Sequence, residues 1–293
     1  MSAGAQPTVS GRWMLIAVSI AIVAAAGCAW LTLCLLFWQG NWQLLYHPEA
    51  QVKRSPSDAG LAYDSVAFAA TDAGVPQLKG WWIPAAADAR YGRYTVLYFH
   101  GEKGNLGDAV EDVAALHAVG LNVLAFDYRG YGQSQFVRPS EAHWREDAEW
   151  ALSYLTATRH VAANTIILDG HGLGADLALE VAAAHAELAG VVVDSLVAHP
   201  MTAVFDDARA RLVPARLLVR DRYDAELAGA ALLVPSLWIF PANLFGKVPG
   251  RSGNPPGYDR ITAGKMTLWI DASGSGGQFA DGVSRWLDEL PRR

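Results

Sequence analysis

Residues 165–186 read TIILDGHGLGADLALEVAAAHA and combine an apolar run, a glycine-rich centre and an alanine-rich run. The run Thr165–Leu168 predicts a buried strand, and Leu173–Ala186 predicts a helix. Glycines at positions 170, 172 and 174 lie between them, where a glycine permits a sharp turn and a close approach of neighbouring backbone. The stretch therefore predicts a strand, a tight turn and a helix, which is the repeating unit of α/β folds.

The same alternation continues on both sides of this stretch. Further strands are predicted at 66–68, 78–83, 94–99, 122–126, 188–193, 236–240 and 266–270, and further helices at 108–119, 141–156 and 282–290. Turn-forming residues separate the first three strands, which predicts an antiparallel start of the sheet. The later strands are continuously apolar and are separated by helices, which is typical of a parallel sheet covered on both faces. Ligands bind such sheets at the carboxyl ends of the strands.

The composition excludes several classes of function. With 52% hydrophobic residues among 293, the chain has enough apolar side chains for a deep core. Its formal charge of −6 comes without the long basic run that is typical of nucleic-acid-binding proteins. Both cysteines, Cys28 and Cys34, lie in an apolar N-terminal stretch, so the remainder has no thiol for a disulfide, a zinc site or a cysteine nucleophile. We expect no nucleic-acid partner, no metal site and no cofactor.

The stretch from Trp13 to Trp38 carries no charge over 26 positions, and about 20 apolar residues are enough to cross a bilayer as a helix. We therefore expect a single membrane anchor, with the lipid bilayer as a partner. A cleaved signal peptide is the alternative, but its apolar core is shorter, at roughly 7 to 15 residues. Arg12 before the helix, against the more distant Lys53 and Arg54 after it, favours a cytoplasmic N-terminus and a domain on the non-cytoplasmic side.

The expected organisation is a tail at 1–12, the anchor at 13–38, a linker at 39–60 and an α/β domain at 61–293. Within the domain, residues 196–231 are helical in character and are interpreted as a cap or helical insertion. Another uncharged stretch, Leu227–Gly246, is long enough for a second membrane span. Pro235 and Pro241 would break such a helix, so we expect a buried strand there instead.

Four motifs follow the predicted strands in order. They are FHGEKGN at 99–105, DYRGYGQS at 127–134, PSE at 139–141 and DGHGLGA at 169–175. Together with YHP at 46–48, they resemble the α/β-hydrolase family, in particular its membrane-anchored branch similar to serine aminopeptidases and monoacylglycerol lipases. The resemblance rests on motifs between Leu45 and Ser195 and on element order beyond them. It implies the α/β-hydrolase fold, with a mostly parallel sheet flanked by helices.

The resemblance also implies a catalytic triad, from which this sequence departs at each position. The family has a serine in the middle of the turn motif, where this chain has Gly172. The family's histidine follows the last strand, near Ser275, yet no histidine occurs after His199. Its acid follows the preceding strand, where Asn243 or Leu244 stands. Nucleophilic catalysis needs an activated nucleophile, so we expect the usual serine-hydrolase machinery to be lost.

A pocket is nevertheless expected above the strand ends, lined by His100, Gly101, Glu102, Tyr131, His171 and Leu173. The backbone N–H groups of Glu102 and Leu173 are at the family's oxyanion-donor positions. The Glu102 carboxylate would oppose an oxyanion there unless its side chain points to solvent, and both orientations are open. His100 and His171 are usually structural in relatives. We expect the pocket to accept an apolar or acyl molecule with one polar end.

Other residues suggest weaker alternatives. Asp194, Ser195 and His199 follow one strand and suggest a displaced serine site, although Ser and Asp commonly cap helices at such places. Ser273 and Ser275 are further candidate nucleophiles. The five arginines between Arg209 and Arg222 are interleaved with aspartates and are interpreted as a solvated helix face, with contact to anionic lipid as the alternative.

Two functions from different classes follow from these observations. The first is a non-catalytic protein that holds a lipid, a peptide or another protein at a membrane. The second is a hydrolase of acyl esters or amides with a displaced nucleophile. The sequence favours the first. The two are distinguished by whether a serine lies within hydrogen-bond reach of a histidine above the sheet.

Overall fold

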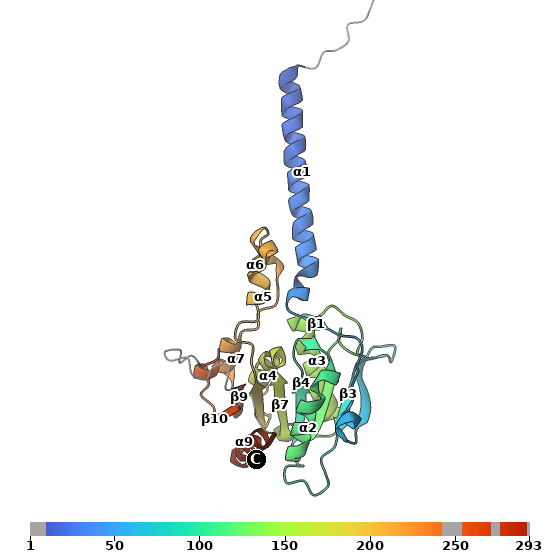
Figure 1. The fold of residues 1–293 in the computed structure, drawn as a ribbon, viewed down its shortest axis with the longest axis vertical. Coiled ribbons are helices and arrows are strands. Elements are labelled where there is room, and N and C mark those ends of the chain that lie inside the picture. Colours follow the sequence, from blue (N-terminus) through green and yellow to red (C-terminus); the bar gives the residue numbers. More distant parts are fainter. Residues whose placement is uncertain (1–9, 242–253, 271–275, 292–293) are drawn as a thin grey trace, which may run out of the picture. The chain divides into compact units, whose positions relative to one another are not determined.

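The computed structural model describes residues 10–241, 254–270 and 276–291 (Figure 1). The chain divides into two compact units. The first comprises residues 1–44 and 202–220, and the second comprises residues 45–201 and 221–293. The predicted strand–turn–helix stretch lies wholly in the second unit.

One eight-stranded sheet organises the second unit, with the order β10-β9-β8-β7-β4-β6-β3-β2. Its strands are β2 (Asp64–Ala70), β3 (Pro76–Ile83), β4 (Thr95–Phe99), β6 (Asn122–Asp127), β7 (Ile166–His171), β8 (Gly190–Asp194), β9 (Ser236–Pro241) and β10 (Lys265–Ile270). β3 pairs antiparallel with both β2 and β6, and the other neighbours are parallel. The expected α/β-hydrolase sheet, with its antiparallel start, is confirmed. β9 is also the buried strand expected between the two prolines.

Helices cover both faces of this sheet. α2 (Val110–Val119) and α9 (Gly276–Glu289) share a buried cluster with alternate residues of the central strands, such as Val96 and Tyr98 of β4. α3 (Glu141–Ser153) and α4 (Leu173–Ala184) pack against each other on the opposite face, as Figure 1 shows. Burial from both sides explains why these strands are continuously apolar.

The remaining regular elements are short. The second unit also contains α7 (Ala225–Ala231), a π-helical turn (Tyr154–Thr158) and 3-10 turns at Pro56–Ala59, Leu106–Ala109, Ala163–Thr165 and Tyr258–Arg260. Helix ends follow local signals: the Ser140 hydroxyl accepts a hydrogen bond from the backbone N–H of His143 at the start of α3. α2 ends at Gly120, whose φ of +100° suits glycine.

Residues 45–60, assigned above to a linker, are part of the second unit. Leu45 and Tyr46 are buried, and β1 (His47–Pro48) pairs in parallel with β5 (Lys103–Gly104). A two-residue ladder and the buried side chains of Leu45, Tyr46 and Pro56 leave no periodic pattern in a sequence. The compact unit therefore begins earlier than periodicity indicated.

The chain enters the second unit twice, at residue 45 and at residue 221. Tyr46 connects these two segments. Its ring packs edge-on against Trp144 with centroids 5.3 Å apart. Its hydroxyl donates to Asp221 Oδ2 over 2.8 Å and lies 2.7 Å from the hydroxyl of Tyr223. Asp221 in turn accepts from the backbone N–H of Glu141. Both chain segments are thus tied to the start of α3.

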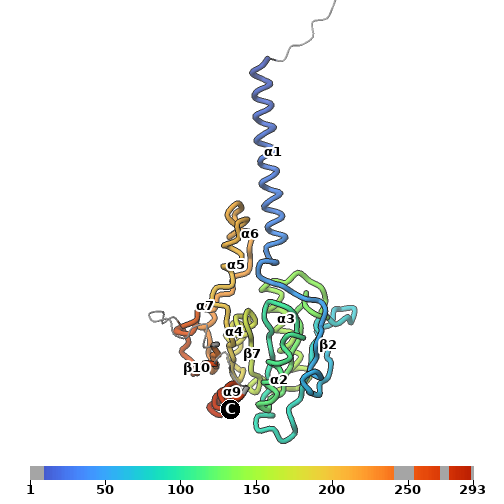
Figure 2. The backbone as a smooth tube through the Cα atoms, in the orientation of Figure 1, coloured from blue at the N-terminus to red at the C-terminus, as the bar shows by residue number. Residues whose placement is uncertain are grey.

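The first unit consists of α1 (Gly11–Gly40), a 3-10 turn (Asn41–Leu44) and part of the predicted insertion. The latter contains α5 (Thr202–Phe205), a 3-10 turn (Ala208–Arg211) and α6 (Ala215–Leu218). α6 packs against α1, and the Trp30 indole N–H donates to the Leu212 carbonyl over 3.0 Å, so the segment runs beside the helix (Figure 2). Within the described residues, α1 is the one helix that is long and apolar enough to cross a membrane.

Candidate functional site

The turn between β7 and α4 has the tight geometry expected of it. A Cβ added to Gly170 would lie 2.1 Å from the Gly174 carbonyl oxygen, and one added to Gly174 would lie 2.3 Å from that of Phe99. Both glycines are therefore required by backbone contacts. Gly172, at the tip, has φ +59° and ψ −125°, and the nearest atom to its added Cβ is Glu102 Oε2 at 3.2 Å. A Cβ at the tip would therefore fit only if the Glu102 side chain gave way by a few tenths of an ångström, and the tip carries none.

The Glu102 carboxylate points into the site. Its Oε2 accepts a hydrogen bond of 3.3 Å from the backbone N–H of Leu173, in the first turn of α4. Two donors fix the Glu102 backbone: the Tyr131 hydroxyl and the N–H of His47 each donate to its carbonyl over 2.8 Å. Free N–H groups at a helix start attract negative charge. Here an internal carboxylate already occupies the donor at which the family would bind an oxyanion.

His171, Asp194 and Ser195 form a second group, on the ends of β7 and β8. Asp194 lies between the other two: its Oδ1 accepts from the Ser195 hydroxyl over 2.8 Å, and its Oδ2 lies 3.4 Å from His171 Nδ1. In a catalytic triad the serine is activated by an imidazole that lies between it and the carboxylate. Here the carboxylate of Asp194 has the middle position instead. His199 is exposed, and among the described residues no serine hydroxyl is hydrogen-bonded to an imidazole ring.

The charge of His171 follows from this pairing. The hydrogen bond to Asp194 raises the pKa of His171 to about 9, and the charges of Asp194, Asp112 and Asp169 act in the same direction against the effect of burial. At neutral pH the ring is therefore protonated and is not a general base.

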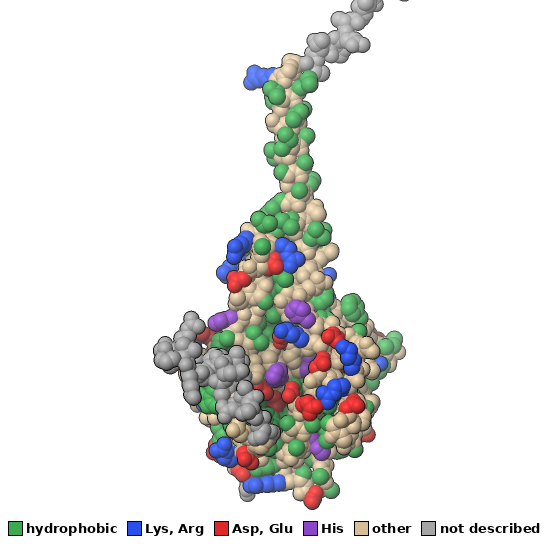
Figure 3. All heavy atoms as spheres, viewed as in Figure 1, with side chains coloured by type: hydrophobic (Ala, Val, Ile, Leu, Met, Phe, Trp, Pro, Cys, Tyr) green, Lys and Arg blue, Asp and Glu red, His purple; other side chains and the backbone are tan. Residues whose placement is uncertain are grey.

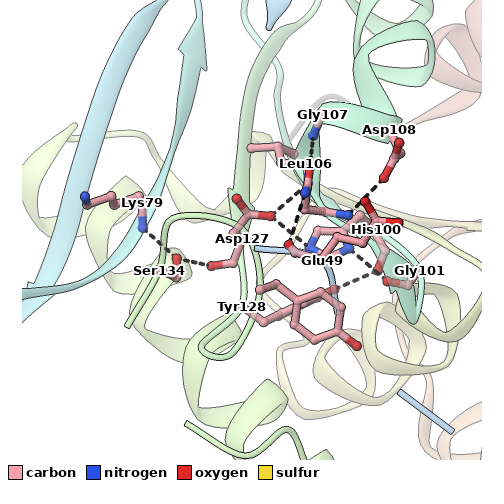
Figure 4. A network of polar contacts seen from close by, with 12 residues as sticks. Glu49, Lys79, His100, Gly101, Leu106, Gly107, Asp108, Asp127, Tyr128 and Ser134 are labelled. Carbon is pink, nitrogen blue, oxygen red and sulfur yellow. Dashed lines mark hydrogen bonds and ion pairs between the residues drawn. The ribbon is translucent and has the colours of Figure 1, made fainter. Parts of the chain in front are cut away.

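His100 makes polar contacts with the loop that follows it (Figure 4). Its Nδ1 lies 2.8 Å from the Gly101 carbonyl oxygen, and the Tyr128 hydroxyl donates to the His100 carbonyl. Burial lowers the pKa of His100 to about 4, so its ring is neutral and Nδ1 is the donor to that carbonyl. Its Nε2 lies 3.6 Å from Asp127, whose Oδ1 accepts from the Leu106 N–H. These contacts give His100 a structural role.

A pocket of about 360 Å³ opens between these groups. It is lined by Tyr98, His100, Gly101, Glu102, Lys103, Asn105, Asp108, Ala109, Asp112, His171 and Gly172. Tyr131 and Leu173, expected in the lining, are fully buried and do not line the pocket. The lining is more polar than expected, because the loop after β4 and the start of α2 face it. Asn243, Ser273 and Ser275 lie outside the described residues.

Sequence reasoning missed Tyr98 and Asp112, which form one wall of the pocket. The Tyr98 hydroxyl donates to Asp112 Oδ2 over 2.7 Å. Tyr98 lies in a predicted buried strand and Asp112 in a predicted helix, and neither belongs to a motif. The only sequence feature that could have indicated this pair is the acidic residue Asp112, one turn into the helix that follows the motif at 99–105. No group of three or more metal-ligating side chains occurs within the described residues.

Comparisons with known proteins identify the family of this chain. The sequence profile of the family described as serine aminopeptidase, S33, matches residues 92–241, half of the chain. The chain belongs to this family of α/β-hydrolases. An uncharacterized protein of Mycobacterium tuberculosis is 29% identical over 248 residues, covering 82% of this chain and 84% of the relative. The protein bem46 of Schizosaccharomyces pombe is 35% identical over 92 residues, covering 31% of this chain and 30% of the relative.

Solved structures share the fold of this family member. The esterase Pf2001 of Pyrococcus furiosus superposes with a TM-score of 0.61 at 20% identity, covering 84% of this chain and 97% of the esterase. An α/β hydrolase of Vibrio vulnificus has a TM-score of 0.57 at 19% identity, covering 79% and 83% of the two chains. At these identities the likeness establishes the fold alone.

The His171–Asp194 pair predicts a pH-dependent contribution to stability. Because the folded pKa of about 9 exceeds the ordinary 6.5, the pair stabilises the fold fully below pH 6.5 and loses this effect as the pH rises through 9. The difference in unfolding free energy between the parent and His171→Gln should shrink over that range, as measured by denaturant titration. In Asp194→Asn, the pKa of His171 should fall toward 6.5 by NMR. An unchanged pKa in that variant would show that Asp194 is not the cause.

Proposed function

We propose that this S33-family chain acts at a membrane as a binding protein, without serine-hydrolase catalysis. One observation carries the proposal: the tip of the turn is Gly172, and the donor beside it, the Leu173 N–H, is already bonded to the Glu102 carboxylate. The nucleophile is missing from the turn, and the oxyanion position holds a negative charge. Acyl transfer requires both of these features in their active form.

A single substitution would not restore serine-hydrolase catalysis. Removal of triad members costs on the order of 10⁶ in turnover number where it has been measured. A serine at 172 would lie beside Glu102 and would lack a neutral imidazole, because His171 is protonated and paired with Asp194. Ser195 is not activated either, because its hydroxyl donates directly to the Asp194 carboxylate and not to an imidazole. This favours binding over displaced catalysis.

Membrane attachment is the second part of the proposal. α1 has 30 residues and its described side chains from Arg12 to Trp30 are exposed, although most of them are apolar. An apolar surface of this extent is stable inside a bilayer rather than in water. The charge bias around the helix supports placing the second unit on the non-cytoplasmic side.

The pocket favours a ligand whose polar end donates a hydrogen bond. A carbonyl or carboxylate oxygen would meet the Glu102 carboxylate at the Leu173 N–H, whereas an amine or alcohol would find acceptors in Glu102 and Asp112. Tyr98 and Ala109 offer apolar surface for a short chain. A volume of about 360 Å³ suits a small molecule. The proposed ligand is thus an apolar molecule with a donating end.

Restoring the nucleophile tests the loss of catalysis. Gly172→Ser and Gly172→Ser/Glu102→Ala should hydrolyse short and long acyl esters only at trace rates, and should label slowly with a fluorophosphonate probe, because no base activates the serine. An active serine esterase serves as the positive control. Rapid turnover that rises as the pH passes 9 would mean that deprotonated His171 is the base, and it would overturn the proposal.

Ligand polarity tests the binding role. Hexylamine and hexanol should raise the melting temperature of the parent more than hexanoate does, and Glu102→Ala should reverse this order by freeing the Leu173 N–H for the carboxylate. Glu226→Ala, which removes a mainly exposed carboxylate outside the pocket lining, serves as the matched control. Equal stabilisation by the three compounds in every variant would place binding away from Glu102.

Fractionation tests the anchor and its direction. The full chain should stay in the membrane pellet after alkaline carbonate extraction, because α1 spans the bilayer. In right-side-out vesicles, added protease should digest the second unit from outside. Release by carbonate would contradict the anchor, whereas retention with protection from protease would contradict the orientation alone.

A further inference from the structure

The segment 202–220 belongs to the same compact unit as α1 rather than to the unit that carries the pocket. Its α6 packs against α1, and the Trp30 indole N–H donates to the Leu212 carbonyl over 3.0 Å. Further along α1, Leu33, Cys34 and Phe37 lose exposure on the same side of the helix, at three, four and seven residues from Trp30. The segment thus contacts the C-terminal third of α1.

The length of α1 sets the depth of this contact. From Gly11 to Ala29 the helix has 19 residues, all of them exposed, and at 1.5 Å per residue they extend about 28 Å. This is close to the hydrocarbon thickness of a bilayer, about 30 Å, so these residues suffice to cross it and the rest of the expected anchor at 13–38 extends to its surface. With Arg12 at one surface, Trp30 comes to the other, at the level where tryptophan is enriched in membrane proteins. The segment bonded to Trp30 is then at the membrane surface too.

The segment itself has the composition of an interfacial element. Leu212 is 62% exposed and Leu217 is 83% exposed, the largest exposure among the large hydrophobic residues of the described chain. It also carries four arginines against two aspartates. Arg209 is bonded to Asp207, and Arg216 lies over the Phe205 ring at 5.4 Å, while Arg211 and Arg220 are exposed. Figure 3 shows these basic side chains over α5 and α6, beside the apolar surface of α1.

We infer that residues 202–220 form a second membrane contact, which lies in the interface of the bilayer that α1 crosses. Leu212 and Leu217 enter the acyl boundary, and Arg211 and Arg220 meet the phosphates of anionic lipids. The inference rests on the proposed anchor. It replaces the earlier interpretation of the arginines as a solvated helix face, because that interpretation leaves two highly exposed leucines in water beside a membrane helix.

Single-cysteine probes on the full chain test the depth of the segment. In a Cys28→Ser/Cys34→Ser background, Leu212→Cys and Leu217→Cys are labelled with an environment-sensitive fluorophore and reconstituted in phosphatidylcholine vesicles with one quarter phosphatidylglycerol. Lipids with a doxyl group near the headgroup end should quench both probes, and aqueous iodide should not. Glu111→Cys, at a charged and 72% exposed side chain in the second unit, is the matched water-exposed control. Ile22→Cys reports on α1 itself.

The outcomes separate the inference from the anchor. Iodide quenching at Leu217 as strong as at Glu111, with Ile22 quenched by lipid, would overturn the inference and leave the anchor in place. Iodide quenching at Ile22 would overturn both. Burial of Leu217 from iodide and from doxyl lipid alike would indicate a protein partner and would also overturn the inference.

Charge provides an independent readout. Each arginine at an anionic surface favours the bound state by roughly fivefold, so lipid quenching at Leu217 should increase when phosphatidylglycerol is added to phosphatidylcholine. Arg211→Gln/Arg220→Gln should lose this dependence. The control pair Arg138→Gln/Arg285→Gln removes exposed arginines of the second unit and should keep it. A dependence that survives in the first variant would contradict the role of the two arginines.

Discussion

The candidate site depends on a contact between backbones, where the β7–α4 turn lies against the end of β4. The approach is so close that Gly174 has the carbonyl oxygens of Phe99 and His100 within 2.5 Å of where its Cβ would be. No side chain fits between these segments. Because of this contact, the start of α4 and the loop after β4 meet at one place, and the Leu173 N–H comes within reach of Glu102.

Glu102 occupies that position at a small entropic cost. Its backbone carbonyl is already held by the Tyr131 hydroxyl and by the His47 N–H, so only side-chain rotations need to be fixed. The carboxylate then gains a hydrogen bond at the positive end of a helix. The same framework that would position an oxyanion donor in an active relative therefore positions an internal ligand in this chain.

The sequence predicted the fold well because the signals that specify it are local. Apolar strands, intervening helices and glycine turns each have a recognisable pattern, and the motifs after β4, β6 and β7 indicated which strand ends meet. It also located Gly172 and the neighbouring Glu102. The direction of the Glu102 side chain could not be predicted, because it depends on the Leu173 N–H, which is 71 residues away in the sequence.

The same limit explains the other differences. Tyr98 and Asp112 meet across a strand and a helix, so no motif joins them. Asp194 and Ser195 were noticed as neighbours, but the partner of Asp194 is His171 of the adjacent strand rather than His199. The arginine-bearing segment has an ordinary mixed-charge pattern, and only its contacts with α1, among them the Trp30–Leu212 hydrogen bond, associate it with that helix.

The backbone of Gly172 has a consequence for folding as well as for chemistry. A residue with a side chain is disfavoured at a φ of +59°, by roughly 1–3 kcal/mol at strained functional positions. Enzymes of this fold accept that strain so that their serine stands clear of the sheet. Glycine adopts the same backbone without it. The glycine that leaves this turn without a nucleophile side chain therefore also removes a source of conformational strain at its tip.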